Sequence, residues 1–213
     1  MMNLLNLVYE SKSVLLPTVG IPIGIKMFNP ITTIMLAKVI KEIEPKVIAL
    51  ECPLDGTWMT SRLEYYNLLD YEYPQLRSLE KFIQESYTEY MSGFNLPTTG
   101  IYCHAWINIL RKGEKITKHN HADAHTKLPT EYSYLSGNLS VQVNDTATRF
   151  ESPYSGTFHD ITNNNGELVM FPSFMHHETT KNNIDIPRYT IAFDIITEEM
   201  YNLTPNKQLF KKL

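Results

Sequence analysis

The spacing of hydrophobic residues changes near residue 100 of this 213-residue chain. Before that point they recur every three to four positions, as in helices that bury one face. One such stripe runs from Leu36 to Ile43. It follows Asn29-Pro30, which combines a capping side chain with a proline at the first helical position. We therefore predict a helix that starts at Pro30 and is ended by Pro45.

A second helical stripe begins near Pro74 and runs from Leu76 to Tyr90, with Gly93 suited to the C-terminal cap. We expect both stripes to be packing surfaces. The aromatic-rich stretch from Gly56 to Tyr73 is expected to be a long ordered loop between the two helices.

From Gly100 onward the hydrophobic period is two, which indicates strands. Residues 135–143 alternate between an apolar and a polar face, and further strands are predicted at residues 102–110, 167–171 and 188–196. Short strands that follow helices favour a mainly β fold, a jelly roll with the N-terminal helices packed outside. We expect a single domain over residues 1–213, made of a helix-rich support (1–99), a jelly-roll core (100–196) and a C-terminal tail (197–213).

Composition is that of an ordinary globular protein, with 43% hydrophobic and 20% charged residues. The formal net charge of −4 argues against a nucleic-acid partner. There is no signal-peptide layout and no apolar run of membrane-spanning length, so we expect a cytoplasmic protein without a membrane partner. Cys52 and Cys103 are expected to be free thiols.

Five of the seven histidines fall in two short clusters, and the first is His119-Asn-His121-Ala-Asp123-Ala-His125. Alternate side chains of a strand share a face, and neighbours on that face have Cα atoms roughly 6.5 Å apart. A single metal ion can therefore be bound by an adjacent pair, either His119 with His121 or His121 with Asp123. Strand geometry leaves both pairs open.

The second cluster, His176-His177, closes an apolar run and follows a Phe171-Pro172-Ser173 turn, near the end of a sheet. Farther on, Arg188 begins a strand on which it shares a face with Thr190 and Ala192. A guanidinium inside a sheet is costly unless it meets an anion, and its planar fork suits a carboxylate. Taken alone, this arginine also fits a structural ion pair.

Together these parts resemble the 2-oxoglutarate/Fe(II)-dependent oxygenases, in particular the branch found in bacteria and tailed phages. The resemblance covers most of the chain, and the block that ends at His177 is its most specific part. The residues that carry it are Gly56-Thr-Trp58, Trp106-Ile-Asn108, Gly113, His119-Asn-His121, Ser136-Gly137, Gly166 to His177, and Arg188-Tyr-Thr190.

The resemblance implies a double-stranded β-helix fold and Fe(II) held by a facial set of side chains, with open positions for 2-oxoglutarate and O₂. The implied iron ligands are His119, His121 and His177, with Asp123 as the alternative carboxylate. Arg188 and Thr190 would bind the far carboxylate of 2-oxoglutarate, and Asn108, Ser136 and Asn138 would line the cofactor pocket. The cofactor chemistry would be oxidative decarboxylation to succinate coupled to attack on a C–H bond, with ascorbate as a supporting reductant.

We therefore predict an Fe(II)- and 2-oxoglutarate-dependent dioxygenase, a hydroxylase of a small molecule or a protein side chain, in the cytoplasm (that of the host if the chain is phage-encoded). Two alternatives come from other classes. A zinc hydrolase or cupin-type metalloenzyme would use the same histidines but have no use for Arg188 with a keto acid. A non-catalytic jelly-roll binding module would bind no metal.

A stretch of chain separates the first histidine cluster from the strand predicted at residues 135–143. Ser136-Gly137 comes fifteen residues after His121, so residues 124–130 are expected to form an inserted loop at the mouth of the site. The remaining histidines, His104, His125 and His159, are expected to be structural or at the surface.

Overall fold

The structure is a computed structural model that describes residues 1–10, 13–50, 62–121, 135–154 and 156–213. Four of its strands, β3, β4, β7 and β9, correspond to the four strands that the sequence predicts. In chain order the elements are β1 (Asn3–Tyr9), β2 (Val19–Met27), α1 (Pro30–Ile48), α2 (Pro74–Gly93), β3 (Ile101–Leu110), β4 (Leu135–Gln142), β5 (Ala147–Glu151), β6 (Phe158–Thr162), β7 (Glu167–Pro172), β8 (His177–Thr179), β9 (Arg188–Thr197), α3 (Glu198–Leu203) and β10 (Lys211–Lys212), with 3-10 turns at Leu68–Asp70 and Lys207–Leu209.

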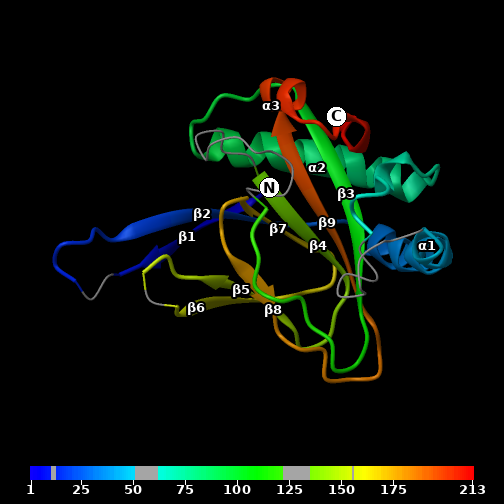
Figure 1. Cartoon of the computed structure of the whole chain (residues 1–213), viewed down its shortest axis with the longest axis horizontal. Coiled ribbons are helices and arrows are strands. Elements are labelled where there is room, and N and C mark those ends of the chain that lie inside the picture. The colour runs from blue at the N-terminus through cyan, green and yellow to red at the C-terminus, as the bar shows by residue number, and fades with distance from the viewer. Residues whose placement is uncertain (11–12, 51–61, 122–134, 155) are drawn as a thin grey trace.

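Two antiparallel sheets face each other, as Figure 1 shows. The larger sheet has seven strands in the order β1-β2-β7-β4-β9-β3-β10, and the smaller has the order β6-β5-β8. The chain around His119 adds to the free edge of β8, because His119 and His177 exchange two backbone hydrogen bonds, of 3.0 and 2.8 Å. This arrangement confirms the mainly β jelly roll that the strand pattern predicts.

Helices α1 and α2 contribute to the main hydrophobic core together with the large sheet (Figure 1). On β9 the odd-numbered residues, such as Ile191 and Phe193, belong to this core. Even-numbered Arg188 and Thr190 line a pocket on the other face, since strand side chains alternate. One face of the strand therefore packs the core, and the other is available for chemistry.

Helix α1 starts as predicted but ends later. The Asn29 side chain accepts a hydrogen bond of 3.0 Å from the backbone N–H of Thr32, which caps the first turn. The helix continues through Pro45 to Ile48, contrary to the prediction that this proline ends it. A proline removes one helical hydrogen bond, but the last turn carries the fully buried Val47 into the core, and that packing favours helical structure beyond the proline.

Helix α2 covers the predicted range, but Gly93 is its last residue and Phe94 is its cap. The left-handed residue that follows is Asn95, at φ 56°. A Cβ at position 93 would lie 2.1 Å from Leu4 Cδ1, so a larger residue there would require the Leu4 side chain to move.

The two ends of the chain differ from the prediction. Residues 1–27 were included in a helix-rich support, yet β1 and β2 form a hairpin that extends the large sheet at one edge. Residues 197–213 were expected to be a tail, yet they form α3 and β10, and β10 pairs with β3 at the other edge. Ile196, Met200 and Phe210 bury a small apolar cluster there, which explains the order of this segment.

Several predicted features lie wholly or partly outside the described residues, namely Cys52, the first part of the 56–73 loop, and the 124–130 insertion. The described part of the 56–73 stretch contains the 3-10 turn at Leu68–Asp70. Cys103 is a buried free thiol, and burial raises its pKa well above the usual value. No helix in the described part of the chain is long and apolar enough to span a membrane.

Candidate metal centre

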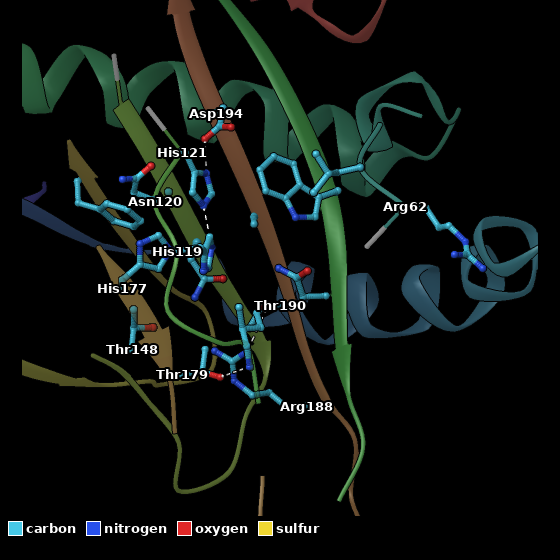
Figure 2. A pocket seen from close by; sticks show the side chains of 18 of the residues that line it. Arg62, His119, Asn120, His121, Thr148, His177, Thr179, Arg188, Thr190 and Asp194 are labelled. Atoms are coloured by element: carbon cyan, nitrogen blue, oxygen red, sulfur yellow. Dashed lines mark hydrogen bonds and ion pairs between the residues drawn. The ribbon is translucent and has the colours of Figure 1, made fainter. Parts of the chain in front are cut away.

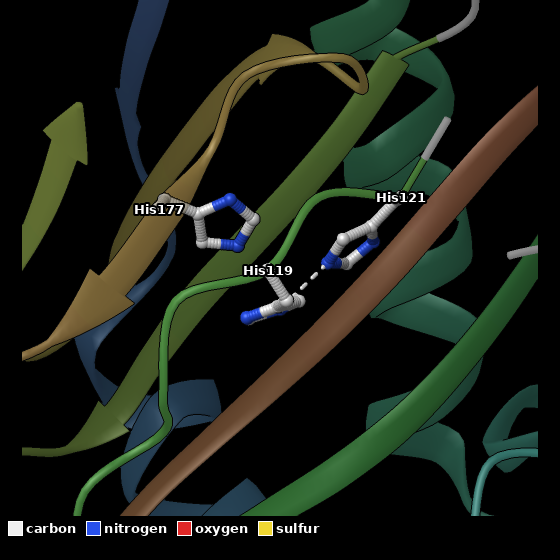
Figure 3. A group of neighbouring side chains, drawn as sticks. All are labelled: His119, His121 and His177. Carbon is white, nitrogen blue, oxygen red and sulfur yellow. Dashed lines mark hydrogen bonds between the residues drawn. The ribbon is translucent and has the colours of Figure 1, made fainter. Parts of the chain in front are cut away.

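Three imidazole rings converge inside the jelly roll, as Figure 3 shows. They belong to His119 and His121, on the segment beside β8, and to His177, the first residue of β8. One ring nitrogen from each lies within 4.8 Å of the others, and His119 Nε2 is 3.1 Å from His121 Nε2. Two nitrogens bound at right angles to one ion lie about 3 Å apart, because each metal–nitrogen bond is about 2.1 Å. The spacing therefore suits a shared metal ion.

The opposite nitrogen of each ring contacts a hydrogen-bond acceptor. His119 Nδ1 is 2.8 Å from Thr117 O, and His177 Nδ1 is 3.0 Å from Met175 O. His121 Nδ1 is 2.7 Å from Asp194 Oδ1. Carbonyl oxygens accept only, and so does an ionised carboxylate, so each Nδ1 carries the hydrogen. The Nε2 atoms then carry no hydrogen and could bind a metal ion, and each ring is held by its outer hydrogen bond.

Burial keeps two of these rings neutral. It lowers the pKa of His119 to about 4, with the neighbouring His121 as the next cause. It also lowers the pKa of His177 well below the usual value for histidine. Both groups are neutral at pH 7 and can bind a metal ion without first losing a proton.

The turn after β7 aligns the two histidine-bearing segments. Met175 N donates to Pro172 O at 3.1 Å, which reverses the chain directly before His177. In the same turn, Ser173 O accepts from the backbone N–H of His121 at 2.9 Å. The predicted turn thus positions a histidine from each cluster through backbone contacts.

The histidines open into a pocket of about 310 Å³ between the two sheets (Figure 2). Strands β3, β4 and β9 contribute Asn108, Asn138 and Thr190 to its lining. Asn108 lies opposite Thr190 in the β3–β9 register, and Asn138 lies opposite Ala192 in the β4–β9 register. The Asn138 Oδ1 is buried without a hydrogen-bond partner among the described residues. Both asparagines are therefore in the predicted pocket.

Arg188 lies at the other end of the same pocket and is only 1% exposed. Its guanidinium donates to Thr146 Oγ1 at 3.2 Å, to Thr190 Oγ1 at 3.3 Å and to Asn163 Oδ1 at 3.1 Å. All three acceptors are neutral, and no carboxylate in the described part of the chain forms an ion pair with this arginine. Burial lowers its pKa to about 10, so it stays charged at pH 7. A buried cation without a counter-ion is a site for an anion.

The remaining predicted site residues divide into two groups. Ser136 is not among the pocket-lining residues, and its hydroxyl instead donates to Asp194 Oδ1 at 2.6 Å. Asp123 and His125 lie outside the described residues. As expected, His104 and His159 are elsewhere. His104 is buried with its Nε2 3.1 Å from Tyr66 O, and His159 is exposed with its Nε2 3.2 Å from Val8 O.

Three residues that contact the site were not predicted from the sequence. Asp194 could have been found, because it continues the even-numbered face of β9 that begins with Arg188. Thr146 and Asn163 gave no signal, because they flank β5 and β6 and meet Arg188 only through the fold. Asn163 N donates to Thr146 O at 2.9 Å, which aligns the two side chains under the guanidinium.

Comparisons with known proteins agree with this geometry. Residues 104–194 match the family model described as "Putative 2OG-Fe(II) oxygenase". No curated relative matches the chain.

Three solved structures resemble the fold. A prolyl-4-hydroxylase from Pseudomonas putida is 14% identical, with a TM-score of 0.56 over 83% of this chain and 88% of that one. The alpha-ketoglutarate-dependent carbocyclase SnoK from nogalamycin biosynthesis is 9% identical, with a TM-score of 0.61 over 90% and 91%. The structure titled CytC3 with Fe(II) and alpha-ketoglutarate is 15% identical, with a TM-score of 0.54 over 81% and 71%. At these identities the likeness concerns the fold.

Proposed function

Because residues 104–194 match the 2OG-Fe(II) oxygenase family model, we propose that the three converging histidines in this part of the chain hold iron. The protein is an Fe(II)- and 2-oxoglutarate-dependent oxidoreductase that consumes O₂. The ligands we propose are His119, His121 and His177. The observation that carries this proposal is that each Nδ1 has an outer acceptor while the opposite nitrogens converge.

We propose that Arg188 and Thr190 bind the far carboxylate of 2-oxoglutarate. The buried guanidinium has only neutral partners among the described residues, so a dianionic ligand would supply the missing negative charge. Asn108, beside Thr190, is proposed to contact the same cosubstrate. Ser136 was also a cofactor-binding candidate, and its contact with Asp194 supports an indirect role behind His121.

The bound iron and cosubstrate supply the oxidising power, with 2-oxoglutarate converted to succinate and CO₂ while a substrate C–H bond is oxidised. The chain's own residues do the rest. The histidines present nitrogen ligands on one side of the pocket, and Arg188 orients the cosubstrate from the other. Residues of both sheets line the space between them. We propose hydroxylation of a small molecule or a protein side chain, in the cytoplasm.

The proximal ligand pair is the first part of the proposal to test. His119→Ala should lose iron, whereas Asp123→Ala should retain most of it, as measured by metal analysis after anaerobic loading. His121→Ala should abolish iron binding, because His121 belongs to both candidate pairs. The reverse pattern for the first two variants would move the site to His121 and Asp123, and would make it a two-histidine, one-carboxylate centre.

The activity itself is tested by succinate release. Purified protein with Fe(II), ascorbate and O₂ should convert 2-oxoglutarate to succinate across a panel of small metabolites and peptides, faster with the true substrate than without one. The comparison variant is His177→Ala, which removes a proposed ligand. Equal succinate release by the two proteins would refute the proposed centre.

A further inference from the structure

A carboxylate lies directly behind one of the three histidines. Asp194 is fully buried on β9 and accepts from His121 Nδ1 at 2.7 Å and from Ser136 Oγ at 2.6 Å. The Ser136 hydroxyl is also 2.8 Å from Ser173 Oγ, which belongs to the turn that holds the His121 backbone. Figure 2 shows His121 directly below Asp194, with a dashed line joining the two side chains. This chain of contacts joins a buried carboxylate to a proposed iron ligand.

The three histidines are not equivalent in this respect. His119 and His177 donate their Nδ1 hydrogens to backbone carbonyls, which are neutral. His121 Nδ1, by contrast, donates to the carboxylate of Asp194. A charged acceptor makes a stronger hydrogen bond than a neutral one and increases the electron density on the opposite nitrogen. Of the three histidines, His121 is therefore expected to be the strongest electron-pair donor to the metal.

We propose that Asp194 is a positioning residue whose negative charge acts on the metal through His121. The inference rests on the proposed function. A set of three histidine ligands leaves the full positive charge of Fe(II) in place, whereas most iron sites of this kind include one carboxylate ligand. Asp194 supplies that negative charge indirectly, through the imidazole of His121. Its hydrogen bond also holds the His121 ring in the orientation that points Nε2 toward the other two histidines.

Asp194 is not itself placed as a ligand. The His121 ring lies between its carboxylate and the point where the nitrogens converge, since its Nδ1 faces Asp194 and its Nε2 faces His119. The converging group among the described residues contains the three histidines and no carboxylate. The charge therefore acts at a distance, and a direct bond to the metal is not required.

Asp194→Asn separates charge from shape. The amide keeps the volume and can still accept from His121 through its oxygen, but it carries no charge. Cobalt(II) is a suitable probe, because its absorption reports on the ligand field. We expect Co(II) affinity, measured by chelator competition on the full chain, to fall roughly tenfold to a hundredfold. The Co(II) absorption bands should shift as well. The matched control is Asp185→Asn, an exposed carboxylate paired with Lys112, which should change neither property.

Unchanged Co(II) affinity and an unchanged spectrum in Asp194→Asn would overturn the proposal and leave Asp194 as a spacer. His121→Ala separates this failure from a failure of the proposed function. If that variant still binds Co(II) normally, the metal site itself is wrong. If it loses Co(II) while Asp194→Asn does not, only the role of Asp194 is wrong.

A second measurement needs no variant, in case Asp194→Asn does not fold. In the zinc-loaded wild-type protein, ¹⁵N-histidine NMR should show three Nδ1–H groups on metal-bound rings. The proton of His121 should resonate well downfield of the other two, because a carboxylate is its acceptor. Three resonances at similar positions would contradict a charged acceptor at His121 and so overturn the proposal.

Discussion

The histidine end and the Arg188 end of the pocket suit ligands of opposite charge. At the histidine end, hydrogen bonds orient three rings so that one nitrogen of each converges, an arrangement that suits a cation. At the other end, Arg188 is fully buried and donates only to neutral oxygens, which is an arrangement for an anion. One cosubstrate with a metal-chelating keto acid at one end and a carboxylate at the other satisfies both. The comparison teaches that the pocket is polarised along its length.

The two ends also differ in how they are stabilised without a ligand. Each histidine has an outer hydrogen bond at Nδ1, on the side of the ring away from the converging nitrogens. Arg188 has its hydrogen bonds but no compensating charge in the described part of the chain, so ligand binding should change its energy more. The following experiments test this contrast, from the largest expected effect to the smallest.

Removing a ligand should have the largest effect. Loss of an outer partner of a metal ligand typically costs 10–100-fold in affinity, so His177→Ala should weaken Co(II) or Fe(II) binding by more than about a hundredfold. Metal titration of the purified variant gives the measurement. His159→Ala, the same change at an exposed histidine, should bind normally. Stoichiometric metal in His177→Ala would remove the cation site from this end of the pocket.

Arg188→Ala should weaken 2-oxoglutarate binding on the order of a hundredfold, because a desolvated charged pair is lost. Metal affinity without the cosubstrate should be unchanged. Arg188→Lys should restore only part of the affinity, since an ammonium cannot make the two-pronged contact. Calorimetry on the metal-loaded protein measures both, with the exposed Arg77→Ala as control. Equal 2-oxoglutarate affinity in Arg188→Ala would exclude this arginine as the anion site.

Asn163→Asp should weaken 2-oxoglutarate binding without removing the arginine. The asparagine oxygen is 3.1 Å from Arg188 Nη2, so an aspartate there gives the guanidinium an internal counter-ion that competes with the cosubstrate. We expect roughly a tenfold loss of affinity or more, since a charged contact of this kind is worth about 1.5–3 kcal/mol.

The same variant should unfold at an equal or higher temperature, because the buried charge is now paired. The exposed Asn183→Asp is its control and should bind 2-oxoglutarate normally. Unchanged cosubstrate affinity in Asn163→Asp would mean that the guanidinium does not need an anion.

Thr146→Val should have the smallest effect. It removes one acceptor of Arg188, at 3.2 Å from Nε, and leaves the charge in place. Two other acceptors still hold the guanidinium, so 2-oxoglutarate affinity should change only about two- to tenfold. The exposed Thr88→Val on α2 serves as the matched substitution. A loss as large as that of Arg188→Ala would show that Thr146 itself contacts the cosubstrate.

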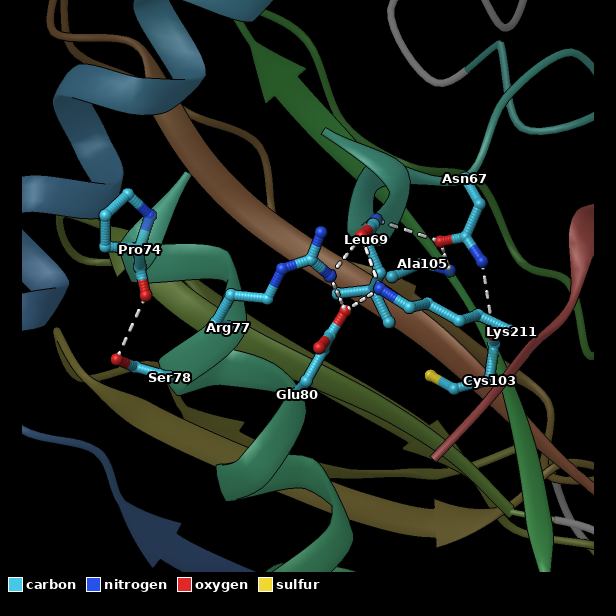
Figure 4. A network of polar contacts seen from close by, with 9 residues as sticks. All are labelled: Asn67, Leu69, Pro74, Arg77, Ser78, Glu80, Cys103, Ala105 and Lys211. Atoms are coloured by element: carbon cyan, nitrogen blue, oxygen red, sulfur yellow. Dashed lines mark hydrogen bonds and ion pairs between the residues drawn. The ribbon is translucent and has the colours of Figure 1, made fainter. Parts of the chain in front are cut away.

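Residues 197–213 are held in place by long-range contacts, which local sequence patterns do not predict. This segment carries no strong helical or strand period, yet Lys211 Nζ donates to Leu69 O at 3.0 Å and pairs with Glu80 of α2 (Figure 4). In the same network, Asn67 Nδ2 donates to Cys103 O and Leu209 O, each at 2.9 Å. Contacts between residues more than a hundred positions apart keep this segment on the sheet, and no window of sequence contains them.

The sequence by itself determined the strands of the core and the faces of those strands. Alternation is a local property, so it placed Arg188 with Thr190 on the polar face of β9, and the structure confirms that both line the pocket. The strand pattern also predicted the jelly roll. The resemblance of short motifs, rather than spacing alone, indicated the iron and cosubstrate chemistry that the family match supports.

Only the tertiary structure decided which residues complete the two ends of the pocket. His119 and His177 lie side by side because β8 pairs with the segment before His121. Asn163, which follows β6, accepts a hydrogen bond from Arg188, the first residue of β9. Which strands pair depends on the energy of the whole fold, whereas a local pattern reports only which face of a strand is apolar. For that reason the sequence predicted which residues of β9 share the polar face. It did not predict that Thr146 and Asn163 would contact Arg188.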